Sequence, residues 1–207
     1  MVFQIPFLQF VGKVWNRGQA AGNKDVILLD IVEVEYPVEW DRVHVMLSDE
    51  RWVPEDHERS NARMLKERLF VNRAAAAHFE PFHIPGETPA RAAPALSDRL
   101  ADEMPISLLL LGMGTDMHTA SLFPGADGLE DALHTTEASV FATSVSGVET
   151  AQRISLTGQV LNGAMSKHLV ITGAEKRDAL ERAQALGDPM VAPICAVLSG
   201  MTVHWAA

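Results

Sequence analysis

The stretch that decides the fold reads Leu108-Leu109-Leu110-Leu111-Gly112-Met113-Gly114-Thr115-Asp116-Met117-His118-Thr119-Ala120-Ser121-Leu122-Phe123-Pro124-Gly125. An uninterrupted apolar run ends at a turn with two glycines, and this turn delivers Asp116 and His118. The order predicts a buried parallel strand, a tight loop and then the start of a helix rich in small hydroxyl residues. Ligands of open α/β sheets collect at the carboxyl end of such strands, so His118 is a candidate catalytic residue.

Apolar runs typical of strands recur along the chain, at residues 26–34, 43–47, 107–111, 140–143, 168–172 and 196–198. Helical patterns lie between several of them, at 61–70, 90–103, 158–165 and 175–186, and residues 79–94 read as a proline-rich loop. Ser60 is a candidate N-cap, and Gly173 is expected to turn the chain into the last of these helices. We expect one α/β domain over 1–207, Rossmann-like, with a mostly parallel sheet covered by helices.

Composition narrows the class of protein. The chain has 207 residues, 17 Lys and Arg against 27 Asp and Glu, and a formal net charge of −10. The acidic balance argues against a nucleic-acid surface but leaves room for a small phosphorylated substrate. The single Cys195, the lack of a basic leader and the absence of an apolar run of about 18 residues favour a cytoplasmic protein with no membrane span. We expect a monomer or a weak homo-oligomer.

The glycine turn offers two kinds of chemistry. Gly112 and Gly114 would let backbone N–H groups approach an anion at a helix start. A dinucleotide fingerprint would need a third glycine where Met117 stands, so nicotinamide binding is not expected. Asp116 can fix the tautomer of His118 and raise its basicity, as a general base requires; the alternative is a capping Asp beside a surface His.

Charged residues also follow other predicted strands. Asp49 and Arg51 come just after the apolar run 43–47, where Arg51 could clamp a carboxylate or phosphate, or else pair structurally with Asp49 or Glu50. Ser121 lacks the G-x-S-x-G elbow of a nucleophile, so capping or packing is its expected role. His57 is expected to be a solvated loop residue. No His, Cys and carboxylate set has metal-ligand spacing.

Taken together, the chain from about residue 40 to its end resembles the 6-phosphogluconolactonases, within the wider glucosamine-6-phosphate isomerase/6-phosphogluconolactonase family. The segments that carry the resemblance are Asp49-Glu50-Arg51-Trp52-Val53-Pro54, Ser60-Asn61, Gly112-Met113-Gly114-Thr115-Asp116, His118-Thr119-Ala120-Ser121-Leu122-Phe123-Pro124-Gly125, Arg153-Ile154-Ser155-Leu156-Thr157 and Lys176-Arg177. The resemblance implies a sugar-phosphate isomerase/deaminase-like fold. It also implies hydrolysis of 6-phosphoglucono-δ-lactone in the oxidative pentose phosphate pathway, with no metal or organic cofactor.

The resemblance further implies roles for individual residues. His118 would activate water and return the proton to the ring oxygen, Asp116 would orient His118, and Arg51 with turn N–H groups would position the substrate or stabilise an oxyanion. Arg153 and Lys176 are expected to bind the phosphate. The complete set of expected substrate-binding residues is Asp49, Asn61, Gly112, Gly114, Arg153 and Lys176.

The chain departs from the family pattern in two places. Members of the family carry a Ser-Gly-Gly phosphate loop about thirty residues before the Asp-Glu-Arg motif, whereas residues 23–34 here hold several carboxylates and no glycine pair. An altered start would explain why residues 1–38 are atypical. Met117 stands where the family has glycine; if that position needs a positive φ, the side chain costs on the order of 1 kcal/mol.

Three functional hypotheses follow. The first is an active lactonase. The second is a weakened or inactive homologue that only binds sugar phosphates or a partner, motivated by Met117 and the missing phosphate loop. The third is an amino-sugar-phosphate isomerase or deaminase on the same fold, which the Thr119–Gly125 sequence disfavours.

Overall fold

The computed structural model describes residues 38–145 and 151–207, so the expectations for residues 23–34 and almost all of 1–38 lie outside the described residues. Its strands are β1 (His44–Met46), β2 (Asp49–Arg51), β3 (His78–Glu80), β4 (Leu108–Leu111), β5 (Val140–Ser144), β6 (Gln152–Leu156), β7 (Ser166–Thr172) and β8 (Thr202–Ala206). Its α-helices are α2 (Asn61–Arg68), α3 (Pro89–Leu100), α4 (Leu129–His134), α5 (Gly158–Asn162) and α6 (Ala174–Leu186). Short 3₁₀ helices are η1 (Trp40–Arg42), η2 (Asn72–Ala76), η3 (Ala101–Glu103) and η4 (Pro193–Ala196).

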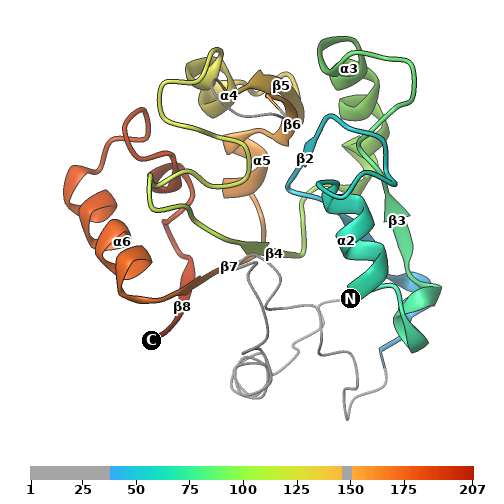
Figure 1. Cartoon of the computed structure of the whole chain (residues 1–207), viewed down its shortest axis with the longest axis horizontal. Coiled ribbons are helices and arrows are strands. Elements are labelled where there is room, and N and C mark those ends of the chain that lie inside the picture. Colours follow the sequence, from blue (N-terminus) through green and yellow to red (C-terminus); the bar gives the residue numbers. More distant parts are fainter. Residues whose placement is uncertain (1–37, 146–150) are drawn as a thin grey trace.

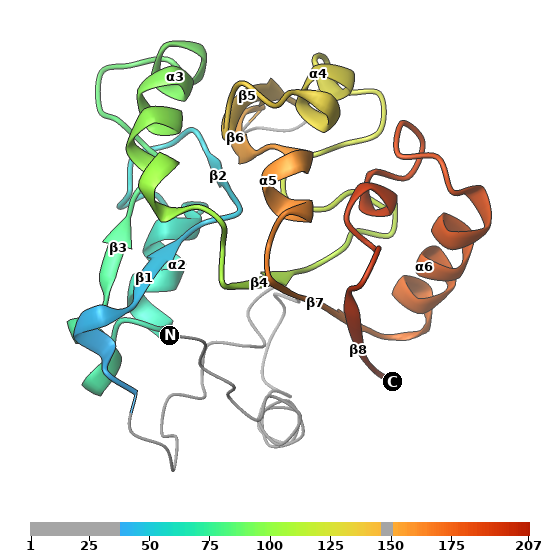
Figure 2. The ribbon, with the colours of Figure 1, turned by 180° about the vertical axis from the view of Figure 1, so that it is seen from behind.

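The strands form two parallel groups and one antiparallel sheet. β4, β7 and β8 are parallel in the order β4-β7-β8, and β1 pairs with β3 in parallel. β2, β6 and β5 form an antiparallel sheet in that order. Figures 1 and 2 agree in placing β1, β3, α2 and α3 at one end of the molecule and α6 with β8 at the other. The expected α/β class is confirmed, with parallel strands and helices against them.

The opening apolar run forms β4 as expected, parallel to β7 with Leu111 beside Leu169. Leu109 and Leu111 are buried in the core, but Leu108 and Leu110 are 46% and 36% exposed. The expected burial on both faces is therefore wrong for the described residues, which cover only one face of this strand.

The antiparallel sheet is the main departure from the expected parallel arrangement. Asp49 to Arg51 follow the end of β1 as expected, but they also form a strand of their own, β2, with Asp49 opposite Ser155 and Arg51 opposite Arg153 on β6. A strand is predicted from a run of apolar residues or from alternating apolar and polar residues. Three charged residues in a row have neither pattern, so the sequence did not predict β2. The pairing puts two arginines side by side.

Three further expectations are wrong. No helix starts after the glycine turn; residues 113–128 are turns and irregular segments with one isolated bridge, Thr119 to Leu122, and α4 begins only at Leu129. Residues 196–198 are not a strand, because Pro193 starts the 3₁₀ helix η4 in that segment and the strand β8 follows later. The proline-rich segment 79–94 also contains structure, including the first turns of α3 with Pro94 inside the helix.

The expected helix starts at Ser60 and Gly173 are confirmed. The Ser60 hydroxyl accepts a hydrogen bond from Arg63 N (3.2 Å) at the N-terminus of α2. Gly173 turns the chain with φ +80°, a value that favours glycine, and α6 begins at the next residue.

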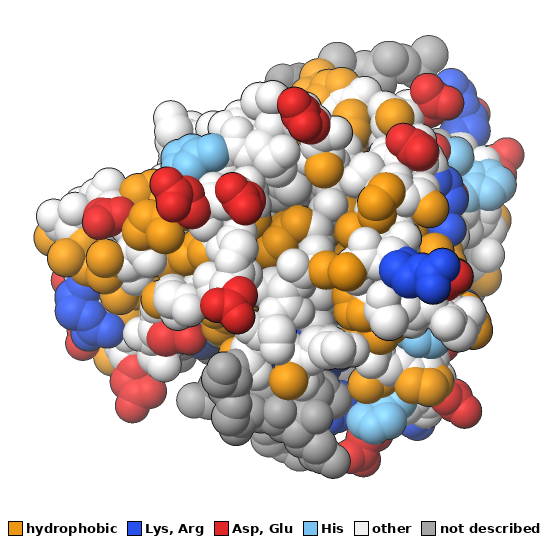
Figure 3. Space-filling model, turned by 90° about the horizontal axis from the view of Figure 1, so that it is seen from above, with side chains coloured by type: hydrophobic (Ala, Val, Ile, Leu, Met, Phe, Trp, Pro, Cys, Tyr) orange, Lys and Arg blue, Asp and Glu red, His pale blue; other side chains and the backbone are white. Residues whose placement is uncertain are grey.

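The surface reflects the acidic composition. On the face drawn in Figure 3, acidic side chains are spread among apolar and uncharged ones, and Lys and Arg side chains show mainly along the right side of the view, with one patch at the left. In the described segments 38–145 and 151–207, no helix is long and apolar enough to cross a membrane.

The buried carboxylate of Glu50 joins β2 to α2. One oxygen accepts from Arg51 N and Asn61 N, both at 2.8 Å. The other accepts from Ala62 N (2.8 Å) and Ser60 Oγ (3.1 Å). Burial raises the pKa of the Glu50 carboxyl, and these hydrogen bonds partly offset that rise. A buried acid is thus satisfied by the free N–H groups of a helix start.

Replacing Glu50 by Gln should destabilise the fold. Each carboxylate oxygen accepts from a backbone N–H, so either orientation of the amide leaves one buried donor facing an NH₂ group. We expect Glu50→Gln to lower the free energy of unfolding by roughly 2–3 kcal/mol, measured by urea denaturation at neutral pH.

The matched control is Glu55→Gln, which removes an exposed ion pair with Lys66 (2.6 Å). This change should cost less than about 1 kcal/mol. Equal losses in the two variants would contradict the role assigned to Glu50.

Candidate active site

The turn after β4 closes on itself through its backbone. Gly114 N donates to His118 O (3.0 Å), and Met117 N donates to Gly114 O (3.0 Å). A Cβ on Gly114 would lie 2.3 Å from Asp116 Oδ1 and 2.4 Å from His118 Nδ1. Any side chain at this position would have to displace the Asp116 and His118 side chains, which occupy that space. Gly112 differs, because a Cβ there would meet open space.

Asp116 holds the imidazole of His118. Asp116 Oδ1 lies 2.5 Å from His118 Nδ1 and also accepts from His118 N (3.3 Å). The hydrogen bond from His118 lowers the pKa of Asp116, so the carboxylate stays ionised and accepts a hydrogen bond from Nδ1–H. The neutral ring then keeps its lone pair on Nε2, the nitrogen that can take a proton from water.

Met117 adopts a left-handed backbone conformation with φ +69°. The expectation that this position needs a positive φ is confirmed, and the side chain packs against the core. Met117 O accepts a hydrogen bond from Ile194 N (3.1 Å), so η4 holds the strained residue from outside the turn. Such a conformation is costly for a residue with a Cβ.

Buried hydroxyl groups fix the segment that follows His118. Thr119 Oγ1 donates to Gly112 O (2.9 Å). Ser121 Oγ donates to Asp49 Oδ2 (2.6 Å), while Ser121 N donates to Ser155 Oγ (3.2 Å). Thr119 therefore fastens the loop to the end of β4, and Ser121 fastens it to the antiparallel sheet, in keeping with the packing role expected for Ser121. A helix dipole does not act here, because no helix starts in this loop.

Arg51 is held by neutral oxygens. Its Nη1 donates to Arg59 O (2.9 Å) and to Asn61 Oδ1 (2.7 Å), and Asn61 Nδ2 donates to Asp49 O (2.9 Å). The alternative, an ion pair with Glu50, is wrong. Both oxygens of the Glu50 carboxylate already accept hydrogen bonds from other donors. Within the described residues, the buried Nε of Arg51 has no hydrogen-bond partner.

Arg153 lies beside Arg51 on the neighbouring strand and is only 8% exposed. Its buried Nε also has no partner among the described residues. Burial lowers the pKa of Arg153, opposed by the nearby Asp49 and reinforced by Arg51. Two neighbouring guanidinium groups with unused N–H donors are suited to an anion.

Phe123 links the histidine to this cationic part of the site. Its ring stacks on His118 with the centroids 4.1 Å apart and the planes 25° apart. The Arg153 guanidinium carbon lies over the same ring, 5.3 Å from its centre. The sequence alone assigns no role to Phe123. The only signal is its place inside the segment His118–Gly125, which carries the family resemblance.

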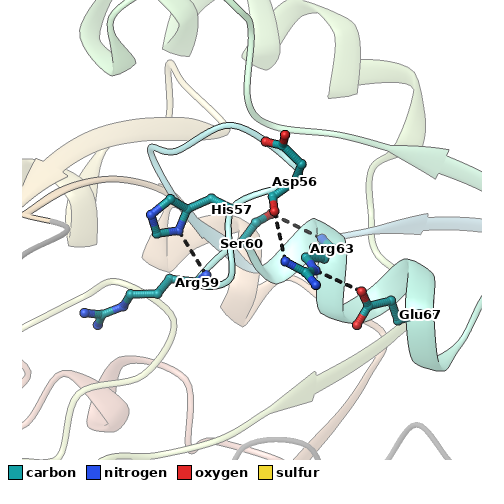
Figure 4. A network of polar contacts seen from close by, with 6 residues as sticks. All are labelled: Asp56, His57, Arg59, Ser60, Arg63 and Glu67. Atoms are coloured by element: carbon teal, nitrogen blue, oxygen red, sulfur yellow. Dashed lines mark hydrogen bonds and ion pairs between the residues drawn. The ribbon is translucent and has the colours of Figure 1, made fainter.

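A second polar network lies at the start of α2 (Figure 4). Arg63 donates to Asp56 O (2.9 Å) and to Glu67 (2.8 Å), and Arg59 N donates to the ring nitrogen Nδ1 of His57 (3.1 Å). His57 therefore supports a turn. The side chain of Arg59 extends away from this network.

Lys176 lies in the first turn of α6, just after β7. Because the carboxyl ends of parallel strands meet at one edge, it reaches the same edge as Gly112. Within segments 38–145 and 151–207, no three His, Cys, Asp or Glu side chains form a group that could hold a metal ion.

Comparisons with known proteins agree on the relatives. The model of the family described as glucosamine-6-phosphate isomerases/6-phosphogluconolactonase matches residues 22–205. The 6-phosphogluconolactonase of Rhizobium meliloti (strain 1021) is 39% identical over 82% of this chain and 75% of that protein. The 6-phosphogluconolactonase of Pseudomonas aeruginosa is 36% identical over 92% of this chain and 82% of that protein.

Solved structures give the same result. The crystal structure of a 6-phosphogluconolactonase from Shewanella baltica OS155 has a TM-score of 0.83 and 31% identity, and the match covers 97% of this chain and 89% of that one. Since the family model also spans most of the sequence, the chain belongs to the glucosamine-6-phosphate isomerase/6-phosphogluconolactonase family.

Proposed function

We propose that this chain hydrolyses 6-phosphoglucono-δ-lactone to 6-phosphogluconate in the oxidative pentose phosphate pathway. The observation that carries the proposal is the Asp116–His118 pair, which is connected through Phe123 to the buried Arg153. A base beside two neighbouring arginines suits attack of water on a lactone that also bears a phosphate. The two relatives and the crystal structure described above support this substrate.

In the proposed mechanism, His118 Nε2 takes a proton from water as the water oxygen adds to the lactone carbonyl. The resulting oxyanion is stabilised by N–H donors of Arg51 and of the glycine turn. When the bond to the ring oxygen breaks, the imidazolium returns its proton to that oxygen, which becomes a hydroxyl. Asp116 keeps the ring in one tautomer throughout and opposes the positive charge that forms on it.

The substrate contacts belong to the same proposal. Arg153 and Lys176 bind the phosphate. Gly112 offers its backbone N–H group, whereas Gly114 N already donates to His118 O, so Gly114 contributes the space that Asp116 and His118 occupy. Asn61 and Asp49 hold Arg51 and the loop respectively, and the unused donors of Arg51 face the substrate.

The proposal also covers the partner, the location and the oligomeric state of the chain. A small phosphosugar lactone is the only partner that the site needs, and the chain works in the cytoplasm as a monomer or weak homo-oligomer. Burial raises the pKa of the Cys195 thiol, which donates to Ala183 O (3.1 Å), so this cysteine is kept in its unreactive form.

The first test is enzyme-dependent lactone opening at mildly acidic pH, where the spontaneous reaction is slow. We expect the native chain to turn over the lactone and His118→Ala to lose roughly 10²–10⁴-fold in kcat. His134→Ala, at an exposed histidine near the end of α4, is the control and should retain the native rate.

Each outcome separates the hypotheses. Turnover of an amino-sugar phosphate would favour an isomerase or deaminase instead. Binding of 6-phosphogluconate without any lactone turnover would favour the weakened homologue. Equal rates in the native and His118→Ala chains would remove this histidine from the mechanism.

Gly114→Ala tests the steric requirement beneath the catalytic pair. The added methyl group must displace Asp116 and His118, so we expect kcat to fall roughly 10²-fold. Gly112→Ala places a methyl group in open space and should show the native free energy of unfolding, so it controls for the general effect of alanine in this turn. A native kcat in Gly114→Ala would refute the geometry.

Met117 is tested by comparing two truncations. Met117→Gly and Met117→Ala both lose the packed side chain, but only alanine keeps the strain of φ +69°. We expect the glycine variant to be the more stable of the two by about 1 kcal/mol in urea denaturation, the reverse of the usual order. If alanine were the more stable, strain at this position would be excluded.

A further inference from the structure

Phe123 is unusual among the phenylalanines of the described residues. Phe82 is fully buried in the hydrophobic core, and Phe70 and Phe79 pack against that core and against each other. Phe123 is half-buried and is not part of the core cluster that the described residues form. Its ring contacts instead involve a histidine and an arginine. Core packing therefore does not explain an aromatic side chain at this position.

The stacking fixes a degree of freedom that Asp116 leaves open. The hydrogen bond at 2.5 Å holds one ring atom of His118, Nδ1, but it permits the imidazole to tilt about that atom. A flat contact at 4.1 Å and 25° fixes the plane of the ring. Together the two contacts determine where Nε2 points.

The Phe123 ring also contacts the Arg153 guanidinium. The guanidinium lies over the ring at 5.3 Å, and the π face attracts a cation there. The ring is not a carboxylate or carbonyl acceptor, and the buried Nε of Arg153 has no hydrogen-bond partner among the described residues, so it remains for an anion. The ring therefore orients the guanidinium without consuming its donors.

We propose that Phe123 is a positioning residue that sets the direction of the His118 imidazole and of the Arg153 guanidinium together, and so fixes the spacing between the catalytic base and the phosphate-binding cation. This inference rests on the proposed lactonase function. It assigns to one ring an effect on both the chemical step and substrate binding.

Kinetics of Phe123→Leu and Phe123→Tyr test the proposal. Leucine keeps an apolar side chain but no flat π face, so we expect kcat to fall and KM to rise, each by roughly tenfold. Tyrosine keeps the face and should restore both constants to within about twofold of the native values. In an Arg153→Lys background, Phe123→Leu should raise KM much less than in the native chain, because the guanidinium that it positions is gone.

The matched control is Phe79→Leu. Phe79 is also half-buried and also has a cation over its ring at 5.3 Å, in this case Lys66, but it lies on β3. This variant should keep the native kcat and KM. A comparable loss of activity in Phe79→Leu would show that the effect is general destabilisation, and it would overturn the inference.

NMR and calorimetry test the positioning role of Phe123 without measuring catalysis. Ring protons of His118 stacked on Phe123 feel its ring current, so their NMR signals should move downfield in Phe123→Leu and stay near their native positions in Phe123→Tyr. The affinity for inorganic phosphate, measured by calorimetry, should fall in Phe123→Leu only.

The two proposals fail separately. If the native chain has no lactonase activity but the His118 signals and phosphate affinity respond as described, the function is wrong and the positioning role stands. If lactonase activity is present but Phe123→Leu matches the native chain in kcat and KM, the positioning role is wrong. Failure of Phe123→Leu to fold would also overturn it, because the ring would then be structural.

Discussion

Two hydrogen bonds of Ser121, from its hydroxyl to the Asp49 carboxylate (2.6 Å) and from its N–H to Ser155 Oγ (3.2 Å), join the two halves of this candidate site. The histidine loop grows out of the parallel strand β4, whereas both arginines belong to the antiparallel β2–β6 pair. The correct fold of each sheet alone would not bring the histidine and the arginines together. The fully buried Ser121, bonded to Asp49 and to Ser155, ties the loop to both strands, β2 and β6.

Polar side chains hold the elements of this candidate site together through hydrogen bonds, whereas apolar packing holds the rest of the fold together. Glu50 fastens β2 to α2, Asn61 fastens Arg51, and Thr119 fastens the turn to the end of β4. Hydrogen bonds specify direction, whereas apolar contacts specify mainly proximity. A site that must aim an imidazole and two guanidinium groups benefits from the former. The cost is that removing one partner leaves the other buried and unsatisfied.

The sequence predicts the parts of the fold that have long, regular patterns. The helices α3 and α6 and the strands β4 and β7 repeat apolar residues at helical or strand spacing, and Ser60 and Gly173 mark helix starts. β2 was missed because its three residues are charged and its burial depends on pairing with β6. The candidate base and arginines followed from motif and resemblance, whereas the role of Phe123 required coordinates, because stacking is a tertiary contact. Met117 was flagged by comparison with the family, and its φ confirmed the reason.

The hydrogen bond from Ile194 N to Met117 O has a consequence for how the protein is made. A chain emerges from the ribosome from its N-terminus, so the whole histidine motif is outside long before residue 194 has been translated. During that interval the turn lacks the hydrogen bond that holds Met117 in its left-handed conformation. A nascent chain, or a product cut short before η4, therefore carries every residue of the motif without the support that holds it in its working shape.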